Sequence, residues 1–427
     1  MSDTQATAAA EWRAHWPMVF AAMVGMSFYS MFAYSQQMFI EPLEKQFHWP
    51  RAEFSLGYSI FGMCAFLFGP FVGAAIDRWG ARPIAVPGVL LSALAFAALG
   101  FTGSSLWQWY GLWLVLALVG LGVKSTVWSV AVSGAFTASR GMALAIMLCG
   151  SALAQFFAPL VGNWLIHDYG WRQAYHLIGV GWGGLALVLT ALFFFDAGRG
   201  RAKAAAQPTA ALASLPGLTF RQSMRDPVIL RIFAANLFSS LVGSGVTFHL
   251  KPIVVETGLT STGAAEIAAL AGIGGIVGKL LTGWLLDRVQ GNAVPFFSYA
   301  LTAVAYLLLL DTFHSHAAVA IGVLIIGYTS GAGLGLTAYL ISRYAGMKAY
   351  GAVFGALGSM LMLGTVVGPP LAGKAHDLTG SYAALLIGAI PVVLGSALLM
   401  IGLGSYPEFP AAPFNTREEA EADAVLG

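Results

Sequence analysis

Long apolar stretches, separated by short polar turns, follow one another along the chain. Twelve of them have the length of a membrane-spanning helix, at about 16–40, 52–76, 83–102, 107–134, 141–166, 172–195, 228–250, 262–286, 292–311, 317–341, 350–375 and 381–404. The one long polar connection, residues 196–227, is rich in Ala, Gly, Pro and Arg, as mobile linkers are. The pattern predicts an all-α membrane protein with two six-helix bundles, residues 1–195 and 228–404, joined by the linker 196–227 and followed by a tail, 405–427.

Composition supports this fold class and limits the kinds of function that we expect. Of the 427 residues, 58% are hydrophobic and 9% are charged, a balance that no soluble globular class has. Residues 1–10 lack the basic stretch and cleavage site of a secretory signal, so we expect the first span to remain as an anchor. Cys64 and Cys149 lie in separate spans without metal-site spacing, and there is no nucleotide loop or catalytic triad. We therefore expect no cofactor, no metal and no enzyme activity.

The basic residues predict the orientation of the chain. With a cytoplasmic N-terminus, 14 Lys and Arg residues fall in inner segments and 5 in outer segments, as the positive-inside rule requires. We predict a multi-pass protein of the cell (inner) membrane with both termini in the cytoplasm. The same rule explains the basic linker, so nucleic acid is not expected as a partner. The two remaining basic residues, Lys124 and Lys279, lie within predicted spans.

The two halves match at a fixed offset of 210 residues. The matching pairs are Pro42 and Pro252, Gly73 and Gly283, Asp77 and Asp287, Arg78 and Arg288, Gly141 and Gly351, Pro159 and Pro369, and Gly170 and Gly380. One offset that holds from the first span to the eleventh indicates an internal repeat of six helices. Parallel six-helix repeats build transporters whose binding site lies at the interface between the halves.

The sequence resembles the major facilitator superfamily over its whole length. The segment 73–82, GAAIDRWGAR, looks like the superfamily's loop motif between its second and third spans, and 283–288 looks like its echo in the second half. Within the superfamily, four segments are similar to the monocarboxylate transporter and oxalate/formate antiporter group: 47–55, 140–143, 169–172 and 278–288. The resemblance implies the major facilitator fold, with two pseudo-symmetric bundles whose first helices line a central cavity.

The chain departs from the group's pattern at three places. Members of the group usually carry Arg at the position of Lys279, where it receives the substrate carboxylate; lysine offers a point charge in place of a bidentate fork. Residues 133–136 replace the group's usual Asn-Arg-Trp-Phe, and Leu357 stands roughly where oxalate/formate exchangers place a second lysine. These departures speak against a small dicarboxylate such as oxalate.

Lys279 is the leading candidate for substrate binding. It lies eight residues before Asp287, about 12 Å inside the membrane, where an ammonium is costly without water, a carboxylate or a ligand. No Asp or Glu occupies a mid-membrane position, so the charged residues deep within the predicted spans are basic and favour an anionic substrate. We predict that Lys279 receives a carboxylate and consider Lys124 a second candidate. The alternative for both is a long stem that reaches the cytoplasmic interface.

Two polar stripes run along the first helix of each half. One holds Ser27, Ser30, Tyr34 and Gln37, and the other holds Asn236, Ser240, Ser244 and Thr247. Because the second repeats most of the first at the offset of 210, we predict that Ser30, Tyr34 and Gln37 and the second stripe line a substrate-binding cavity. The alternative is hydrogen bonding between helices.

Three further groups are candidates for more specific roles. His249 is a possible proton relay, against the alternative of an interfacial residue. Tyr328 is a candidate for hydrogen bonding an organic acid, against simple packing. Asp77, Arg78, Asp287 and Arg288 are predicted gate residues, since each Asp would meet a helix start in the other half, near Gly351 and Gly141, only when the inside is closed. The alternative for them is a turn whose charges only set topology.

The sequence thus predicts an alternating-access carrier for a small organic anion, a monocarboxylate moved with a proton. Exchange of carboxylates without protons, export of neutral hydrophobic compounds, and a transport-dead sensor or scaffold stay open as alternatives. We expect the lipid bilayer as its surroundings and a monomer as the functional unit.

Overall fold

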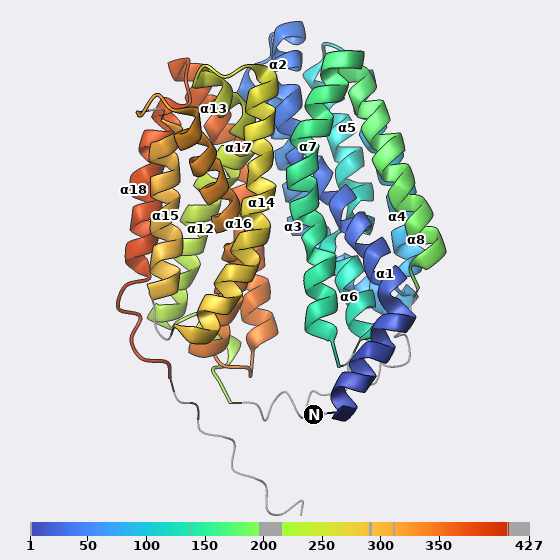
Figure 1. Cartoon of the computed structure of the whole chain (residues 1–427), viewed down its shortest axis with the longest axis vertical. Coiled ribbons are helices and arrows are strands. Elements are labelled where there is room, and N and C mark those ends of the chain that lie inside the picture. The colour runs from blue at the N-terminus through green and yellow to red at the C-terminus, as the bar shows by residue number, and fades with distance from the viewer. Residues whose placement is uncertain are drawn as a thin grey trace, which may run out of the picture.

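The computed structural model describes residues 2–136, 138–195, 216–289, 293–310, 312–407 and 409. Within these ranges all the regular elements are helices, and they form two bundles that stand side by side (Figure 1). The bundle coloured blue to green holds the first half of the chain, and the bundle coloured yellow-green to red holds the second. This confirms the predicted all-α membrane fold.

The N-terminal half contains eight α-helices. They are α1 (Ser2–Tyr34), α2 (Gln36–Phe47), α3 (Arg51–Trp79), α4 (Arg82–Ala98), α5 (Leu106–Gly120), α6 (Ser125–Ala135), α7 (Arg140–Leu177) and α8 (Gly183–Phe193). The first span is α1 with α2, and the fourth is α5 with α6. The long α7 turns at Gly170, whose φ of 81° glycine adopts readily, and this turn separates the fifth span from the sixth.

The C-terminal half begins with a short helix and continues with seven longer ones. They are α11 (Phe220–Ser223), α12 (Pro227–Phe248), α13 (Leu250–Glu256), α14 (Ser261–Arg288), α15 (Ala293–Leu309), α16 (His316–Tyr344), α17 (Tyr350–Thr379) and α18 (Ala383–Leu399). Pro252 accounts for the break between α12 and α13, because its ring excludes a hydrogen bond to the carbonyl of Phe248, where α12 ends.

The helices are long and apolar enough to account for all twelve spans. Nine stretches of the described chain meet the length and hydropathy of a spanning helix, and two shorter apolar helices, α15 and α18, join them. One of the nine, residues 140–193, contains the turn at Gly170 and therefore supplies two spans. Six spans belong to each half, as the sequence repeat predicts.

Parts of the predicted linker and tail lie outside the described residues. Of the linker, residues 216–227 are described, and Leu218 N–H donates to the Ala345 carbonyl over 2.8 Å, so this part packs on the C-terminal half. Residues 196–215 and 410–427 are not described. The domain boundaries drawn from the sequence therefore stay predictions.

The two halves meet along two pairs of helices. In one pair α3 contacts α17, and in the other α7 contacts α14. We call these the α3/α17 seam and the α7/α14 seam. The short helices α2 and α13 also touch one another, at the upper end of Figure 1. Following the predicted topology, we call this the outer end of the molecule and the opposite end, where the N-terminus lies, the inner end.

Candidate functional site

Glycines show where the seams are closed. A Cβ built on Gly373 of α17 would lie 2.5 Å from Ala52 N of α3, and one built on Gly272 of α14 would lie 2.5 Å from Phe156 of α7. Only glycine allows helices to approach this closely. The first contact lies near the outer end, and the second lies about halfway along α14 and the first part of α7. At the inner ends of the same helices, a Cβ on Gly73, Gly283 or Gly351 would meet no atom within 4 Å.

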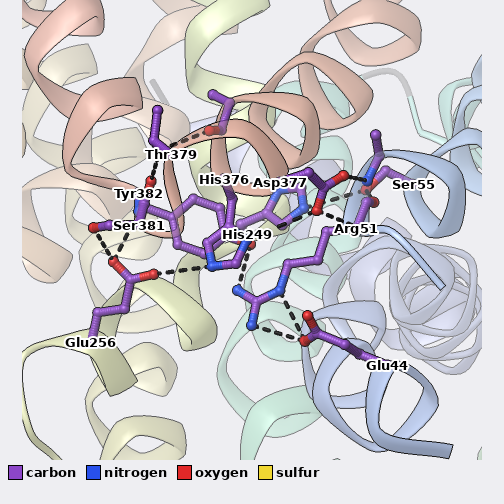
Figure 2. A network of polar contacts seen from close by, with 12 residues as sticks. Glu44, Arg51, Ser55, His249, Glu256, His376, Asp377, Thr379, Ser381 and Tyr382 are labelled. Carbon is purple, nitrogen blue, oxygen red and sulfur yellow. Dashed lines mark hydrogen bonds and ion pairs between the residues drawn. The ribbon is translucent and has the colours of Figure 1, made fainter. Parts of the chain in front are cut away.

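The outer end of the α3/α17 seam is held by a carboxylate from the opposite half (Figure 2). Asp377 on α17 accepts hydrogen bonds from the backbone N–H groups of Arg51 and Ala52, each over 3.0 Å. These N–H groups lie in the first turn of α3 and have no partner within the helix. The N-cap residue, Pro50, has no side chain that could accept from them. Asp377 therefore caps α3 from the other half and meets the positive end of its dipole.

The side chain of Arg51 adds a second link between the halves beside this cap. Its guanidinium pairs with Glu44 over 2.9 Å and donates to the Tyr382 hydroxyl over 3.1 Å. Because Glu44 and Arg51 belong to the N-terminal half and Tyr382 to the C-terminal half, the arginine ties the halves together. The bond to Tyr382 and the cap from Asp377 exist only while the outer ends of the two bundles are in contact.

Glu256, at the end of α13, anchors the C-terminal side of this network. Its carboxylate accepts from the Ser381 hydroxyl over 2.8 Å and from Tyr382 N–H over 2.9 Å, and it lies 3.4 Å from His376 Nε2. Burial alone would raise the pKa of this carboxyl. The hydrogen bonds from His376, Tyr382 and Ser381 outweigh burial and hold the pKa below its ordinary value.

His249 is buried within the closed outer end, in the break between α12 and α13. Its Nδ1 lies 3.0 Å from the Gly245 carbonyl, and its Nε2 lies 3.3 Å from the Ser55 hydroxyl of the other half. Because a carbonyl can only accept, Nδ1 carries a hydrogen. The structure thus buries this candidate relay between the halves; the relay itself stays a prediction.

Gln37 and Ser30 do not line the main cavity of the described residues. The Gln37 side-chain oxygen accepts from the Lys251 N–H of α13 over 2.9 Å, so this residue joins the halves at the outer end. Ser30 is buried and donates to the Met26 carbonyl of its own helix over 2.9 Å. Gln37 shows the hydrogen bonding between helices that the polar stripes left open, whereas the Ser30 hydroxyl bonds within its own helix.

A cavity of about 370 Å³ lies between α12, α15, α16 and α17 and is bounded on the other half by Ala33, Tyr34 and Tyr58. Predicted residues that line it are Tyr34, Asn236, Ser240, Ser244 and Thr247. Further polar residues in its wall are Tyr58, Ser239, Ser298, Tyr299, Thr302, Tyr306, Thr329, Ser330 and Thr365. The stripe of Ser298, Thr302 and Tyr306, spaced by four, was a usable signal in the sequence that our reading missed.

Lys279 lies outside that cavity wall and crosses the α7/α14 seam. Its Nζ donates to the Leu148 carbonyl over 3.1 Å and to the Ser151 hydroxyl over 3.0 Å, both on α7. Gly272 and Gly275 on the same helix pack against Phe156 and Gln155, respectively, which makes this face a packed one. Lys279 is half-buried, its ammonium is held between the halves by these two bonds, and no carboxylate of the described residues pairs with it.

Lys124 and Tyr328 each bond within one half. Lys124 Nζ donates to the Ala65 carbonyl of α3 over 3.2 Å, and both residues belong to the N-terminal half. The Tyr328 hydroxyl accepts from Thr282 over 3.1 Å and so ties α16 to α14. Neither residue lines the cavity, and the substrate-binding roles proposed for them stay predictions.

The predicted inner gate is described only in part. The side chains of Asp77 and Asp287 lie outside the described residues. The arginines that follow them are exposed, and each lies over a tryptophan of its own helix, Arg78 at 5.9 Å from Trp79 and Arg288 at 4.2 Å from Trp284. The gating role of these four residues stays a prediction.

Sequence comparison finds a family and several relatives. The sequence model of the Major Facilitator Superfamily matches residues 18–310 and 253–426. Monocarboxylate transporter 13 of Rattus norvegicus is 28% identical over 349 residues, 80% of this chain and 78% of that protein. Monocarboxylate transporter 11 of Mus musculus is 29% identical over 355 residues, 78% of this chain and 74% of that protein. A gallate transporter of Pseudomonas putida is 28% identical over 293 residues, 59% of this chain and 64% of that protein.

Solved structures share the fold at low identity. A D-xylose–proton symporter superposes with a TM-score of 0.69 at 15% identity, over 93% of this chain and 98% of that one. A bacterial homologue of the human lysosomal transporter Spinster, solved inward-facing and occupied, superposes with a TM-score of 0.69 at 16% identity, over 90% of this chain and 96% of that one. These structures support the architecture alone.

Proposed function

The chain belongs to the Major Facilitator Superfamily, and we propose that this multi-pass membrane transporter carries a small organic anion of the monocarboxylate type by alternating access. The names of three relatives, two monocarboxylate transporters and a gallate transporter, support a carboxylate as the substrate. Following the charge pattern of its loops, we place the protein in the cell (inner) membrane with both termini in the cytoplasm. We also propose that it functions as a monomer.

The observation that carries the proposal is the isolated charge of Lys279. Its ammonium bonds to one carbonyl and one hydroxyl of the opposite half, and the described chain places no carboxylate beside it. A cation held at this depth is costly unless a counter-charge arrives, so such residues mark substrate paths in membrane proteins. In our account the substrate carboxylate replaces Leu148 and Ser151 as the partner of Lys279.

The closed outer end supports the alternating-access part of the proposal. Asp377 and Arg51 hold the α3/α17 seam together, while glycines near the inner ends of the seam helices face open space. We interpret this arrangement as the state with the outer entrance closed. Rocking of the two bundles would release the outer contacts and bring the inner ends together around the predicted gate residues.

Proton coupling completes the proposal. A carboxylate that reaches Lys279 makes a neutral pair, which lowers the electrostatic cost of the buried charge while the bundles move. An accompanying proton would make uptake respond to a pH gradient. Exchange of one carboxylate for another without protons would instead give counterflow that is indifferent to pH, so the two modes are separable in one vesicle preparation.

A second candidate is export of a neutral compound. The wall of the 370 Å³ cavity holds no charged side chain among the described residues, which suits a neutral guest as well as the uncharged part of an acid. Under this alternative, neutralising Lys279 would leave transport of the neutral compound intact. A panel of neutral drugs in the vesicle assay distinguishes the two candidates.

The test is uptake of labelled lactate and benzoate into liposomes with an inward proton gradient. We expect the wild type to accumulate at least one of them, Lys279→Gln to lose accumulation, and Lys279→Arg to keep part of it, because arginine retains the charge. Lys374→Gln is the matched control, since it removes an exposed lysine of α17. Equal uptake by wild type and Lys279→Gln would overturn the assignment of Lys279.

A further inference from the structure

The cavity between α12, α15, α16 and α17 has a wall that is polar but uncharged. Its volume of about 370 Å³ lies within the range of about 300–1,000 Å³ that is typical of small-molecule pockets. A three-carbon acid would fill only part of it. The wall also contains five aromatic residues, namely Tyr34, Tyr58, Phe248, Tyr299 and Tyr306. Size and aromatic lining together suit a guest with a ring-sized body.

Five of the nine serine and threonine hydroxyls in the wall donate their hydrogens to backbone carbonyls. Ser244 donates to the Gly364 carbonyl over 2.7 Å, and Ser240 to the Leu361 carbonyl over 3.1 Å. Three threonines donate to carbonyls of their own helices: Thr302 over 3.3 Å, Thr329 over 3.1 Å and Thr365 over 3.4 Å. A hydroxyl whose hydrogen is used in this way offers only acceptor lone pairs to a guest.

The remaining polar groups do not reverse this balance. Asn236 uses its amide to donate to the Ile232 carbonyl over 2.8 Å, and its oxygen accepts from Thr337 over 2.8 Å. The four tyrosines, Ser239, Thr247, Ser298 and Ser330 can either donate or accept. The described wall holds no lysine or arginine, so it offers a guest several acceptor-only hydroxyls but no charged donor for a carboxylate.

We infer that this cavity binds the hydroxyl-bearing body of the substrate, so that the carried acid is a hydroxylated, ring-sized carboxylate. The inference rests on the proposed function, because Lys279 is needed to receive the acid group outside the acceptor-rich wall. Each substrate hydroxyl donates a hydrogen to a Ser or Thr oxygen. A site that hydrogen-bonds a substrate hydroxyl discriminates strongly against an analogue that lacks it.

The test compares pairs of ligands that differ in the donated hydrogen. Equilibrium binding of 3- and 4-hydroxybenzoate to the purified full-length protein is measured beside binding of 3- and 4-fluorobenzoate, in which fluorine replaces the hydroxyl and cannot donate. We expect at least one hydroxybenzoate to bind about tenfold more tightly than its fluoro counterpart. Fluorobenzoates that bind as tightly as both hydroxybenzoates would overturn the inference.

Variants of the wall connect this preference to the cavity. Ser244→Ala and Thr302→Val each remove an acceptor oxygen, so we expect hydroxybenzoate affinity to fall about tenfold and fluorobenzoate affinity by less than about threefold. Ser359→Ala is the control, because Ser359 is exposed on α17 and bonds to its own helix. Unchanged hydroxybenzoate preference in both cavity variants, with normal thermal unfolding, would contradict the assignment.

The outcomes separate the inference from the function on which it rests. Transport of lactate or benzoate with no preference for hydroxylated acids would sink the inference and leave the anion carrier standing. Failure of every carboxylate to bind or to be transported would sink both proposals. Binding of hydroxybenzoates that survives Lys279→Gln undiminished would support the cavity as a binding site and overturn Lys279 as the receptor of the acid group.

Discussion

The two seams between the bundles differ in where they hold charge. At the outer end of the α3/α17 seam, Asp377 caps α3 and Arg51 bridges Glu44 and Tyr382. The repeat offset of 210 places Ser261 and Thr262 at the corresponding outer end of the α7/α14 seam. There they form only neutral hydrogen bonds with Asn163, over 3.2 and 3.4 Å, respectively. The α7/α14 seam instead carries a charge at Lys279, which lies farther along α14 toward its inner end.

This difference separates two tasks that one pseudo-symmetric fold has to combine. Charged pairs near the water surface cost little to desolvate and can break and re-form as the bundles move. A charge at depth is costly without a counter-charge and is therefore suited to responding to a ligand. We interpret the α3/α17 seam as the one that holds the outer entrance closed and the α7/α14 seam as the one that responds to substrate.

The largest effect is expected from the glycines that let each seam close. Gly373→Ala and Gly272→Ala would place a Cβ against the backbone of Ala52 and of Phe156, and overpacking of this kind costs about 1–3 kcal/mol. The outer ends should separate, visible as a longer distance between spin labels at Tyr169 and Leu378 in liposomes. Gly355→Ala, whose Cβ would meet nothing within 4 Å, is the control.

Alanine favours helix over glycine by about 1 kcal/mol, so lost helix propensity cannot explain an opening of the seams. If Gly355→Ala opened the outer end as widely as the seam variants, the closed contacts at Gly272 and Gly373 would not be what holds the entrance shut.

A smaller effect is expected from the carboxylate cap. Asp377→Asn keeps the size of the side chain but removes the charge that faces the start of α3, a loss of about 1 kcal/mol in favour of the open outer end. Asn163→Ala at the other seam removes two neutral hydrogen bonds that are exposed and long, at 3.2 and 3.4 Å, so we expect it to weaken outer closure less than loss of the charged cap does. The same label pair measures both variants. A larger opening from Asn163→Ala would reverse our ranking of the seams.

The smallest effect concerns the pH dependence of Glu256. Because its partners His376, Ser381 and Tyr382 lower its pKa in the folded protein, its contribution to the free energy of unfolding is fully present above the ordinary carboxyl pKa of about 4.3 and is lost as pH falls through the lowered value. The difference in the free energy of unfolding between wild type and Glu256→Gln should therefore stay constant from about pH 8 to 5 and shrink in stronger acid. A difference that grows on acidification would contradict the sign.

The fold was predictable because both the hydropathy of each span and the internal repeat can be read directly from the order of residues in the chain. Each span needs about 20 apolar residues, and this requirement marked out twelve spans, all of which the described helices can supply. The outer network was not predictable in this way. Asp377 and Arg51 stand 326 residues apart, and only the packing of α17 on α3 brings them into contact.

The candidate site was predictable in part for a similar reason. The stripe on α12 follows a helical period, and four of its residues, from Asn236 to Thr247, line the cavity. The stripe on the first helix failed at Gln37, because the break before α2 turns that residue toward α13. Lys279 was recognisable by its depth, but its present contact with α7 depends on how the halves are docked.

The central claim is that Lys279 receives the carboxylate of the substrate, and paired ligands test it directly. The affinity of the purified protein for a carried acid is compared with its affinity for the corresponding primary amide, in wild type and in Lys279→Gln. We predict that the wild type prefers the acid at least about tenfold and that the variant loses this preference, since only the charge of the ligand differs. A preference for the acid that persists unchanged in Lys279→Gln would contradict the account.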